Sequence, residues 1–276
     1  VRYTDLTAAV KIDRTVTTTP SDKFNAQGYA LEVTTEVYVM DSLGVEKFSR
    51  KTFTQNENID NRGDAAVQKV TSWATDDLGA LVQVTYQELT NREFDSQRNV
   101  KNQKVLTYDA AGGVVLDVQE VRNISFHSSG VALKQIIATY NNDVEWKLLD
   151  VKVIENSVID SSGNVGVSVI TKYASASIAD LGIGMITPTL GSEIDRQTIT
   201  TSSFDLRGNA RSQSILSEYW TGAAFSFSEF KDILNDPYDI HDRTNKSVIT
   251  SYTTASRTAV LSKEEVYYDS YDKWGN

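Results

Sequence analysis

The stretch Phe204-Asp205-Leu206-Arg207-Gly208-Asn209 decides the fold, because the chain repeats it in altered form along much of its length. An Asp at the first position of a type I turn accepts hydrogen bonds from the backbone that follows, and a Gly at the fourth position adopts the left-handed conformation that ends the turn. A type I turn followed by such a residue closes an antiparallel β-hairpin with the correct strand twist. The stretch therefore predicts a hairpin tip, with Phe204 at the end of the incoming strand.

The same turn is predicted at several other positions, and each copy contains an Asp and, three residues later, a Gly. The predicted turn residues are Asp41 and Gly44, Asp60 and Gly63, Asp109 and Gly112, Asp160, Gly163 and Asn164, Asp205, Gly208 and Asn209, and Asp272 and Gly275. Altered copies begin at Asn25, Asp95 and His127. A calcium loop needs about six to eight oxygen ligands, and one or two carboxylates per copy are too few. We therefore interpret these positions as structural turns.

The segments between the turns alternate apolar and polar residues. In residues 31–39, Leu31, Val33, Val37 and Val39 share one face, while Glu32, Thr34, Glu36 and Tyr38 share the other. This period of two is typical of a β-strand with one buried face. Every second turn lies at the same end of the sheet, so hairpins recur about every 32 to 35 residues. The sequence predicts an all-β fold, an antiparallel meander of long repeated hairpins that forms a curved or wound sheet.

Two stretches interrupt this rhythm and divide the chain. Residues 1–173 are predicted to be β-hairpin repeats, 174–195 a loop or short helix, and 196–276 further hairpins with a helical insert at 226–235. In that insert, Ser228 is a candidate N-cap, apolar residues at 230, 233 and 234 form one face, and Pro237 follows as a stop. The parts are expected to form one continuous repeat body. Because the chain starts at Val1 and ends in a turn motif, we expect it to be a fragment of a longer chain.

Composition excludes several classes of protein. The 276 residues carry a formal net charge of −10, which disfavours a nucleic-acid binder. The chain contains no cysteine, so it has neither a disulfide framework nor a thiolate metal site. No run of 18 apolar residues occurs, and no transmembrane helix is predicted.

Candidate chemistry is sparse. The only two histidines are His127, which stands at a turn position, and His241, so no Ser/His/Asp set is indicated and we predict that the chain is not an enzyme. Asp236, Asp239 and Asp242 follow the predicted helix at a spacing of three and form a candidate calcium site. The simpler interpretation, which we favour, is a solvated helix exit without metal or other cofactor.

The motif at Phe204–Asn209, with its relatives at Asp109, Asp160 and Asp272, resembles the Tyr-Asp-x-x-Gly-Asn core of YD or RHS repeats. That family occurs in large bacterial surface and toxin-carrying proteins and in teneurins. The resemblance implies hairpins laid side by side in a sheet that winds into a spiral or shell, with no catalytic residues in the repeats. The Gly-Arg and Thr-Tyr elements usual in the family do not recur here. The sequence Asp236-Pro237-Tyr238-Asp239-Ile240 lacks the Gly-Leu of the family's cleavage motif.

We therefore expect a non-catalytic structural or adhesive repeat segment of a large secreted or cell-surface bacterial protein that builds a shell or fibre. Its expected partners are copies of itself or neighbouring repeats, and a surface glycan or protein. One alternative is a carbohydrate-binding or carbohydrate-active β domain, suggested by the 13 Tyr, 4 Trp and 37 acidic residues. A second is an outer-membrane β-barrel, since strands of about ten residues suit one. Polar residues on the second face of the strands and the lack of aromatic girdles count against the barrel.

Overall fold

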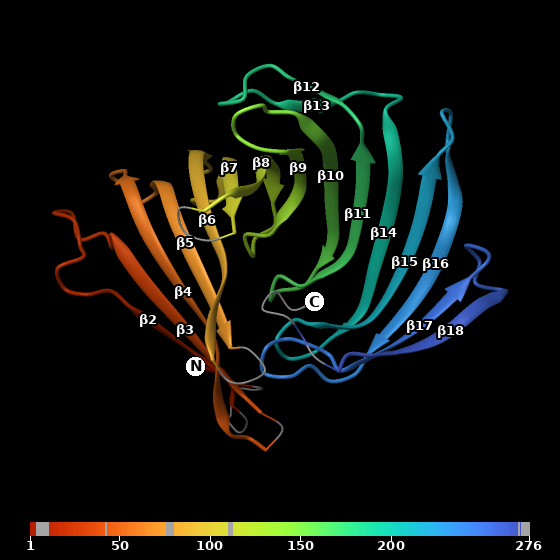
Figure 1. Ribbon diagram of the computed structural model, residues 1–276, viewed down its shortest axis with the longest axis horizontal. Helices are drawn as coiled ribbons and strands as arrows, with labels where there is room; N and C mark the ends of the chain where they lie inside the picture. Colours follow the sequence, from red (N-terminus) through yellow and green to blue (C-terminus); the bar gives the residue numbers. More distant parts are fainter. Residues whose placement is uncertain (4–10, 42, 76–79, 110–112, 270, 272–276) are drawn as a thin grey trace.

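The protein is built around one large antiparallel sheet (Figure 1). The computed structural model describes residues 1–3, 11–41, 43–75, 80–109, 113–269 and 271. Sixteen strands form the sheet in the order in which they occur in the chain, and each pairs antiparallel with its predecessor. The predicted antiparallel meander is thereby confirmed.

The strands of the large sheet are long, and most have 8 to 14 residues. They are β1 (Arg2–Tyr3), β2 (Lys11–Thr18), β3 (Glu32–Met40), β4 (Glu46–Ile59), β5 (Ala65–Thr75), β6 (Leu81–Phe94), β7 (Val100–Tyr108), β8 (Val115–Phe126), β9 (Ala132–Tyr140), β10 (Leu148–Ile159), β11 (Val165–Tyr173), β14 (Glu193–Phe204), β15 (Ala210–Trp220), β16 (Phe225–Asn235), β17 (Lys246–Tyr252) and β18 (Val260–Tyr267). The strands β12 (Ala176–Ile178) and β13 (Ile186–Pro188) form a separate two-stranded sheet.

Every second chain reversal lies at the same end of the strands, and we call this end the turn rim. It carries the reversals at 25–29, 60–64, 95–99, 127–131, 160–164, 205–209 and 239–243. The predicted turns at Asp41 and Asp109 lie at the other end, the opposite rim. One hairpin thus separates each turn of the turn rim from the next.

The sheet is strongly curved, so that a chain reversal of its C-terminal half contacts a strand of its N-terminal half. In Figure 1 it sweeps from β2 on one side, through β7 to β9, to β18 on the other. Strands in a sheet twist by about 20° from one to the next, and this twist accumulates over sixteen strands. As a result the reversal at 239–243 reaches β4, where Arg50 donates to Asp242 at 3.0 Å and His241 Nδ1 lies 3.2 Å from the carbonyl oxygen of Ser49. We call this contact the junction.

The expected helix at 226–235 is wrong, because these residues form β16. Its residues pair with β15, for example Phe230 with Leu216, and with β17, for example Phe230 with Tyr252. A single short helix is marginal in water, whereas a strand here gains hydrogen bonds along both of its edges. The apolar residues at 230, 233 and 234 fit a helical face only by coincidence of spacing.

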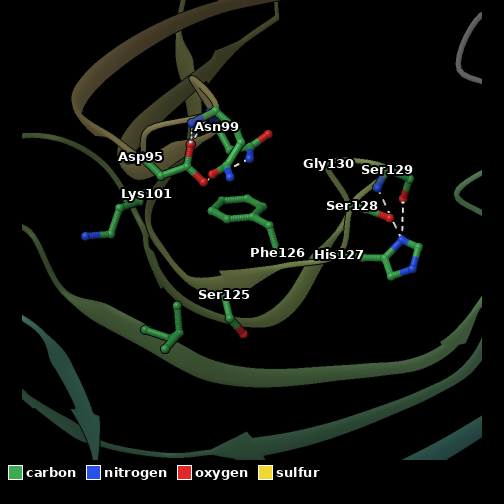
Figure 2. Close-up of a pocket in the computed structure, with 11 residues that line it drawn as sticks. Asp95, Asn99, Lys101, Ser125, Phe126, His127, Ser128, Ser129 and Gly130 are labelled. Atoms are coloured by element: carbon green, nitrogen blue, oxygen red, sulfur yellow. Dashed lines mark hydrogen bonds between the residues drawn. The ribbon is translucent and has the colours of Figure 1, made fainter.

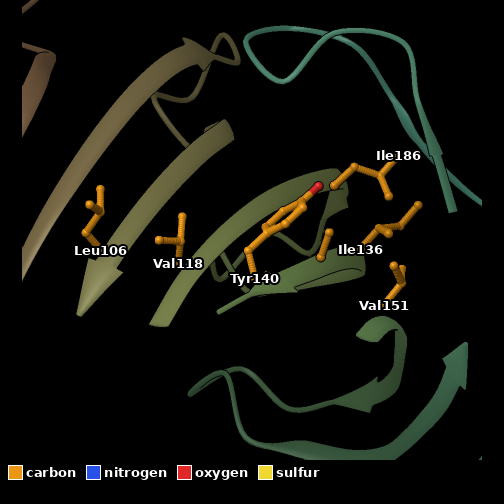
Figure 3. Close-up of a cluster of buried hydrophobic side chains, with 7 residues drawn as sticks. Leu106, Val118, Ile136, Tyr140, Val151 and Ile186 are labelled. Carbon is orange, nitrogen blue, oxygen red and sulfur yellow. The ribbon is translucent and has the colours of Figure 1, made fainter. Parts of the chain in front are cut away.

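The insert at 174–195 also contains no helix, since β12 and β13 form a short hairpin in it. It folds back onto the large sheet, where Ile186 is 1% exposed and packs with buried residues of β7 to β10 (Figure 3). The principal residues of this cluster are Leu106, Val118, Ile136, Ala138, Tyr140 and Val151. The insert therefore supplies the cover for the most apolar part of one sheet face.

Buried charged and amide side chains on the same face hold the insert in place. Glu120 is fully buried and accepts hydrogen bonds from Arg92 at 2.6 and 2.8 Å and from Arg122 at 2.9 Å. Arg122 donates in turn to the carbonyl oxygen of Gly184 at 2.9 Å, and Asn102 donates to that of Gly182 at 3.0 Å. The pairing of Glu120 with Arg92 and Arg122 compensates a buried negative charge that would cost several kcal/mol if it were buried without partners.

In the part of the chain that the structure describes, no helix has the length and apolarity needed to cross a membrane.

Candidate functional site

The turns of the turn rim share one hydrogen-bonding pattern, best illustrated at Asp205. The N–H of Asp205 donates to the carbonyl oxygen of Asn209 at 2.8 Å, and the N–H of Gly208 donates back to that of Asp205 at 3.1 Å. The Asp205 carboxylate accepts the N–H groups of Arg207 and Asn209, both at 2.8 Å. The side chain of the first turn residue, an Asp in five of the seven turns of the turn rim, therefore satisfies backbone donors that the two strands cannot pair.

The same pattern recurs at the other predicted turns. The carboxylates of Asp41, Asp60 and Asp160 each accept two backbone N–H groups, and the N–H groups of Gly44, Gly63 and Gly163 donate to the backbone carbonyl oxygens of these Asp residues. Donation from the backbone and side chain of Asn164 lowers the pKa of Asp160. Asp109 closes a wider loop by accepting the N–H of Val114 at 2.8 Å. The predicted turn residues Gly112, Asp272 and Gly275 lie outside the described residues.

A turn at 239–243 was not predicted, and it occupies the place of the candidate calcium site. The N–H of Asp239 donates to the carbonyl oxygen of Arg243 at 2.8 Å, and Asp242 takes the Gly position with a φ of 61°. The carboxylate of Asp239 accepts the N–H groups of His241 and Arg243. Tyr238-Asp239 is thus a further copy of the repeat, with Asp in place of Gly.

The structure does not bring Asp236, Asp239 and Asp242 together as metal ligands. The Asp242 carboxylate instead receives Arg207 at 3.0 Å and Asn209 at 2.8 Å, besides Arg50. Among the described residues, no group of three or more Asp, Glu, His or Cys side chains has the arrangement needed to hold a metal ion. A turn and a junction contact account for two of these three carboxylates.

A row of polar residues crosses the sheet just inside the turn rim, and we call it the polar ladder. Its members lie four residues before and eight residues after the first residue of the six turns that begin at 60, 95, 127, 160, 205 and 239, and they pair directly across these hairpins. The pairs are Asn56 with Gln68, Asn91 with Gln103, Asn123 with Gln135, Asn156 with Ser168, Thr201 with Gln213, and Asn235 with Ser247. Side-chain hydrogen bonds of 2.6 to 3.1 Å join five of these pairs.

The ladder asparagines also join each hairpin to the one before it. Each donates its side-chain N–H to a backbone carbonyl oxygen that lies five residues after the first residue of the preceding turn. The bonds run from Asn56 to Ala30 (3.0 Å), Asn91 to Ala65 (2.9 Å), Asn123 to Val100 (2.7 Å), Asn156 to Ala132 (2.9 Å) and Asn235 to Ala210 (2.9 Å). Only Thr201 lacks the amide for this bond, so the ladder is interrupted at one hairpin.

Neighbouring turns also contact one another directly. Asp64, 5% exposed, receives Arg98 of the next turn at 2.6 Å and Arg62 of its own turn at 2.6 Å. The hydroxyl of Tyr238 donates to the carbonyl oxygen of Ala210 at 2.8 Å, the same acceptor that Asn235 uses. A Tyr before the Asp of a turn thus adds a second bond to the preceding hairpin.

Shallow grooves separate successive turns. The groove in Figure 2 lies between the turns at Asp95 and His127, encloses about 470 Å³, and has the Phe126 ring near its centre. Similar grooves of about 360 and 440 Å³ lie between the turns at 60 and 95 and between those at 160 and 205. They present amide, aromatic and glycine positions that the repeat places at equivalent points.

Both histidines are engaged in local contacts. His127 Nδ1 lies 2.9 Å from Ser129 Oγ within its own turn, and His241 Nδ1 contacts the Ser49 carbonyl oxygen in the junction. Neither contact includes a carboxylate that would orient a general base. The absence of enzyme activity stays a prediction.

The ladder is the feature that sequence reasoning missed. The turn motif runs from the residue before the Asp to the residue after the Gly, and both ladder positions lie outside this stretch. An Asn four residues before the Asp occurs at Asn56, Asn91 and Asn156, and a Gln eight residues after it occurs at Gln68, Gln103 and Gln213. Aligning the chain on its turns would have revealed these columns.

Comparisons with known proteins leave the chain without an assigned family. No family model matches the sequence, and no curated protein matches it either. A solved structure of the Photorhabdus luminescens Tc holotoxin pore is similar at 11% sequence identity and a TM-score of 0.15. The match covers 96% of this chain and 21% of that chain. At this TM-score the likeness carries no argument about function.

Proposed function

We propose that this chain is a non-catalytic repeat segment that builds part of the wall of a larger bacterial surface or secreted protein. The observation that carries the proposal is the polar ladder, because its asparagines bind five hairpins to the backbone of the hairpin before. Main-chain acceptors are present whatever the side chains are, so hairpins of diverged sequence can still be added in register. Such a rule suits a protein that is extended by repetition.

The sheet geometry supports a shell rather than a flat fibre. The accumulated twist returns the turn at 239–243 to β4, and Arg50, Arg207 and Asp242 fix that contact. The resemblance of the turns to YD or RHS repeats points in the same direction. We place the protein outside the cell or on its surface, in keeping with this resemblance.

The test is the state of the native protein in its source. An antibody against this chain should isolate a species much heavier than 30.6 kDa, and electron microscopy of it should show a shell or fibre. A native species of 30.6 kDa without further mass would overturn the proposal.

The equivalent grooves of the turn rim favour carbohydrate binding as a second candidate function. Successive grooves are two strands apart, which corresponds to about 10 Å along the sheet. Aromatic and amide side chains such as Phe126 and Asn99 line them, and both types suit sugar rings. A glycan array without a hit would remove this candidate and leave the wall function untouched.

A further inference from the structure

Successive turns of the turn rim meet at the same two positions. The fourth residue of each turn lies against the fifth residue of the turn before it, in all six pairs of neighbouring turns. In four pairs the fourth residue is Gly, and a Cβ on that Gly would lie 2.6 to 3.4 Å from the fifth residue. These pairs are Gly63 with Tyr29, Gly130 with Asn99, Gly163 with Val131, and Gly208 with Asn164.

In the other two pairs of turns, a charged residue occupies the fourth position. Arg98 has a φ of 71° and donates from Nε to the Asp64 carboxylate at 2.6 Å. Asp242 has a φ of 61°, and its carboxylate accepts the side-chain N–H of Asn209 at 2.8 Å. The left-handed backbone conformation is unfavourable for residues that carry a Cβ. In both turns the charged side chain thus makes a contact with the preceding turn that Gly could not make.

The third residue of the preceding turn is also charged in these two pairs, and in both it is Arg. Arg62 donates to the carbonyl oxygen of Asp95, the first residue of the next turn, at 3.3 Å. Arg207 donates to the carbonyl oxygen of Asp239 in the same way, at 2.5 Å. In the four Gly pairs the third residues of the preceding turns are uncharged, namely Gln27, Gln97, Ser129 and Ser162. The charged residues therefore occur as sets rather than singly.

We propose that the fourth residue of a turn, together with the third and fifth residues of the preceding turn, forms a recognition set that selects which hairpin follows which. All seven turns have the same two backbone hydrogen bonds, so the backbone of a turn does not distinguish one hairpin from another. Selection among similar partners needs contacts that penalise the wrong neighbour. The inference goes beyond the proposed function, because it concerns the order of hairpins within the chain, whatever the wall encloses.

Exchanging the neighbours of the two charged sets would bring like charges together. Arg98 beside the turn at 205–209 would meet Arg207 and no carboxylate at the fifth position. Asp242 beside the turn at 60–64 would meet Asp64, which is 5% exposed. Two carboxylates that share a buried site cannot both stay charged without a large cost. Each set therefore accepts its own neighbour and disfavours the other.

The test converts one set into the other at the turns 60–64 and 95–99, which lie at the end of β4 away from the junction. Arg98→Asp places a second carboxylate beside Asp64, and we expect the equilibrium constant for unfolding to rise at least about tenfold. Adding Asp64→Asn gives these turns the residue types of Arg207, Asn209 and Asp242. The double variant should recover at least about fivefold of that loss, because the two positions are in direct contact.

The control double variant combines Arg98→Asp with Glu93→Gln. Glu93 lies on the same hairpin with its side chain 51% exposed, so this variant removes the same negative charge outside the recognition set. We expect no recovery from it. Urea unfolding followed by circular dichroism measures all three variants, and hydrogen exchange should place the loss in the backbone N–H groups of the two turns.

Recovery in the control equal to that with Asp64→Asn would reduce the effect to net charge and overturn the proposal. Full stability of Arg98→Asp, or no recovery with Asp64→Asn, would overturn it as well. If Arg98→Asp does not fold, folding of the double variant shows the recovery directly, and failure of both refutes it. None of these results bears on the mass of the native species, which tests the wall function separately.

Discussion

Replacing Asn91 with Ala tests whether the polar ladder binds hairpins together. Asn91 is 4% exposed and donates to the Ala65 carbonyl oxygen at 2.9 Å and to Gln68 Oε1 at 3.1 Å, while it accepts from Gln103 Nε2 at 2.7 Å. A buried group left without its partner costs about 1–3 kcal/mol. The adjoining groove admits water, so we take the lower end for each of the three partners. The expected loss is about 3 kcal/mol in the free energy of unfolding.

The matched control is Thr201→Ala, at the same ladder column in another hairpin. Thr201 accepts one hydrogen bond, from Gln213 at 3.1 Å, and has no bond to the preceding hairpin. Its removal should cost about 1 kcal/mol. Urea unfolding followed by circular dichroism measures both values. If the two variants differ by less than about 0.5 kcal/mol, the bond from Asn91 to the preceding hairpin does not contribute as argued.

Three further predictions concern the same rim. Thr201→Asn should raise the free energy of unfolding by about 1 kcal/mol in the same urea assay. The reason is that the new amide can reach the Val165 carbonyl oxygen through a groove of about 440 Å³. A loss of stability would mean that this hydrogen bond to the preceding hairpin cannot form. Gly208→Ala should lower the melting temperature, since φ is 94° and a Cβ would lie 2.6 Å from Asn164 Oδ1, whereas Ser162→Ala in the neighbouring turn should have little effect. Asp160 has a lowered pKa in the folded state, so its stabilisation is present above the unfolded pKa of about 3.9 and is lost as pH falls through the lower folded value. In Asp160→Asn, the free energy of unfolding should therefore fall less steeply as the solution is acidified. An unchanged pH dependence at acid pH would refute the stabilising role of the Asp160 carboxylate.

The turns were predictable because their determinants are local. Asp205 and Gly208 act within five residues, and an Asp carboxylate that accepts two backbone N–H groups does not depend on distant parts of the chain. The alternation of strands between turns is equally local, and with short connections it leaves an antiparallel meander as the simplest arrangement. For these reasons the fold class and the hairpin period followed from the residues alone.

The helix predicted at 226–235 was wrong because that prediction, too, used only a local pattern. Three apolar residues at helical spacing are a short-range signal, but the decisive interactions of β16 are with two strands that the local pattern does not identify. The turn at Asp239 went unnoticed because Asp242 replaces the Gly that marks most of the other copies. Asp tolerates the left-handed conformation better than most residues do, so the motif admits this exchange.

The junction lay beyond sequence reasoning altogether. The contact of Arg50 with Asp242 joins residues 192 positions apart, and it depends on the sum of many small twists between strands. No single residue encodes that sum. The buried Glu120, Arg92 and Arg122 were missed likewise, because nothing in a polar stretch of β8 shows that an insert 60 residues later will cover it.

These observations explain how a long sheet can be specified by a weak sequence repeat. An aromatic or aliphatic residue, an Asp and a Gly fix each turn, and a ladder Asn fixes the neighbour by binding a carbonyl oxygen, which every residue has. The side chains elsewhere on the strands are then free to vary with what each part of the sheet must contact, as Glu120 does beneath the insert. The interruption at Thr201 shows that one missing link is tolerated when hairpins on both sides retain theirs. A wall assembled in this way can diverge in sequence almost everywhere and still wind with the same geometry.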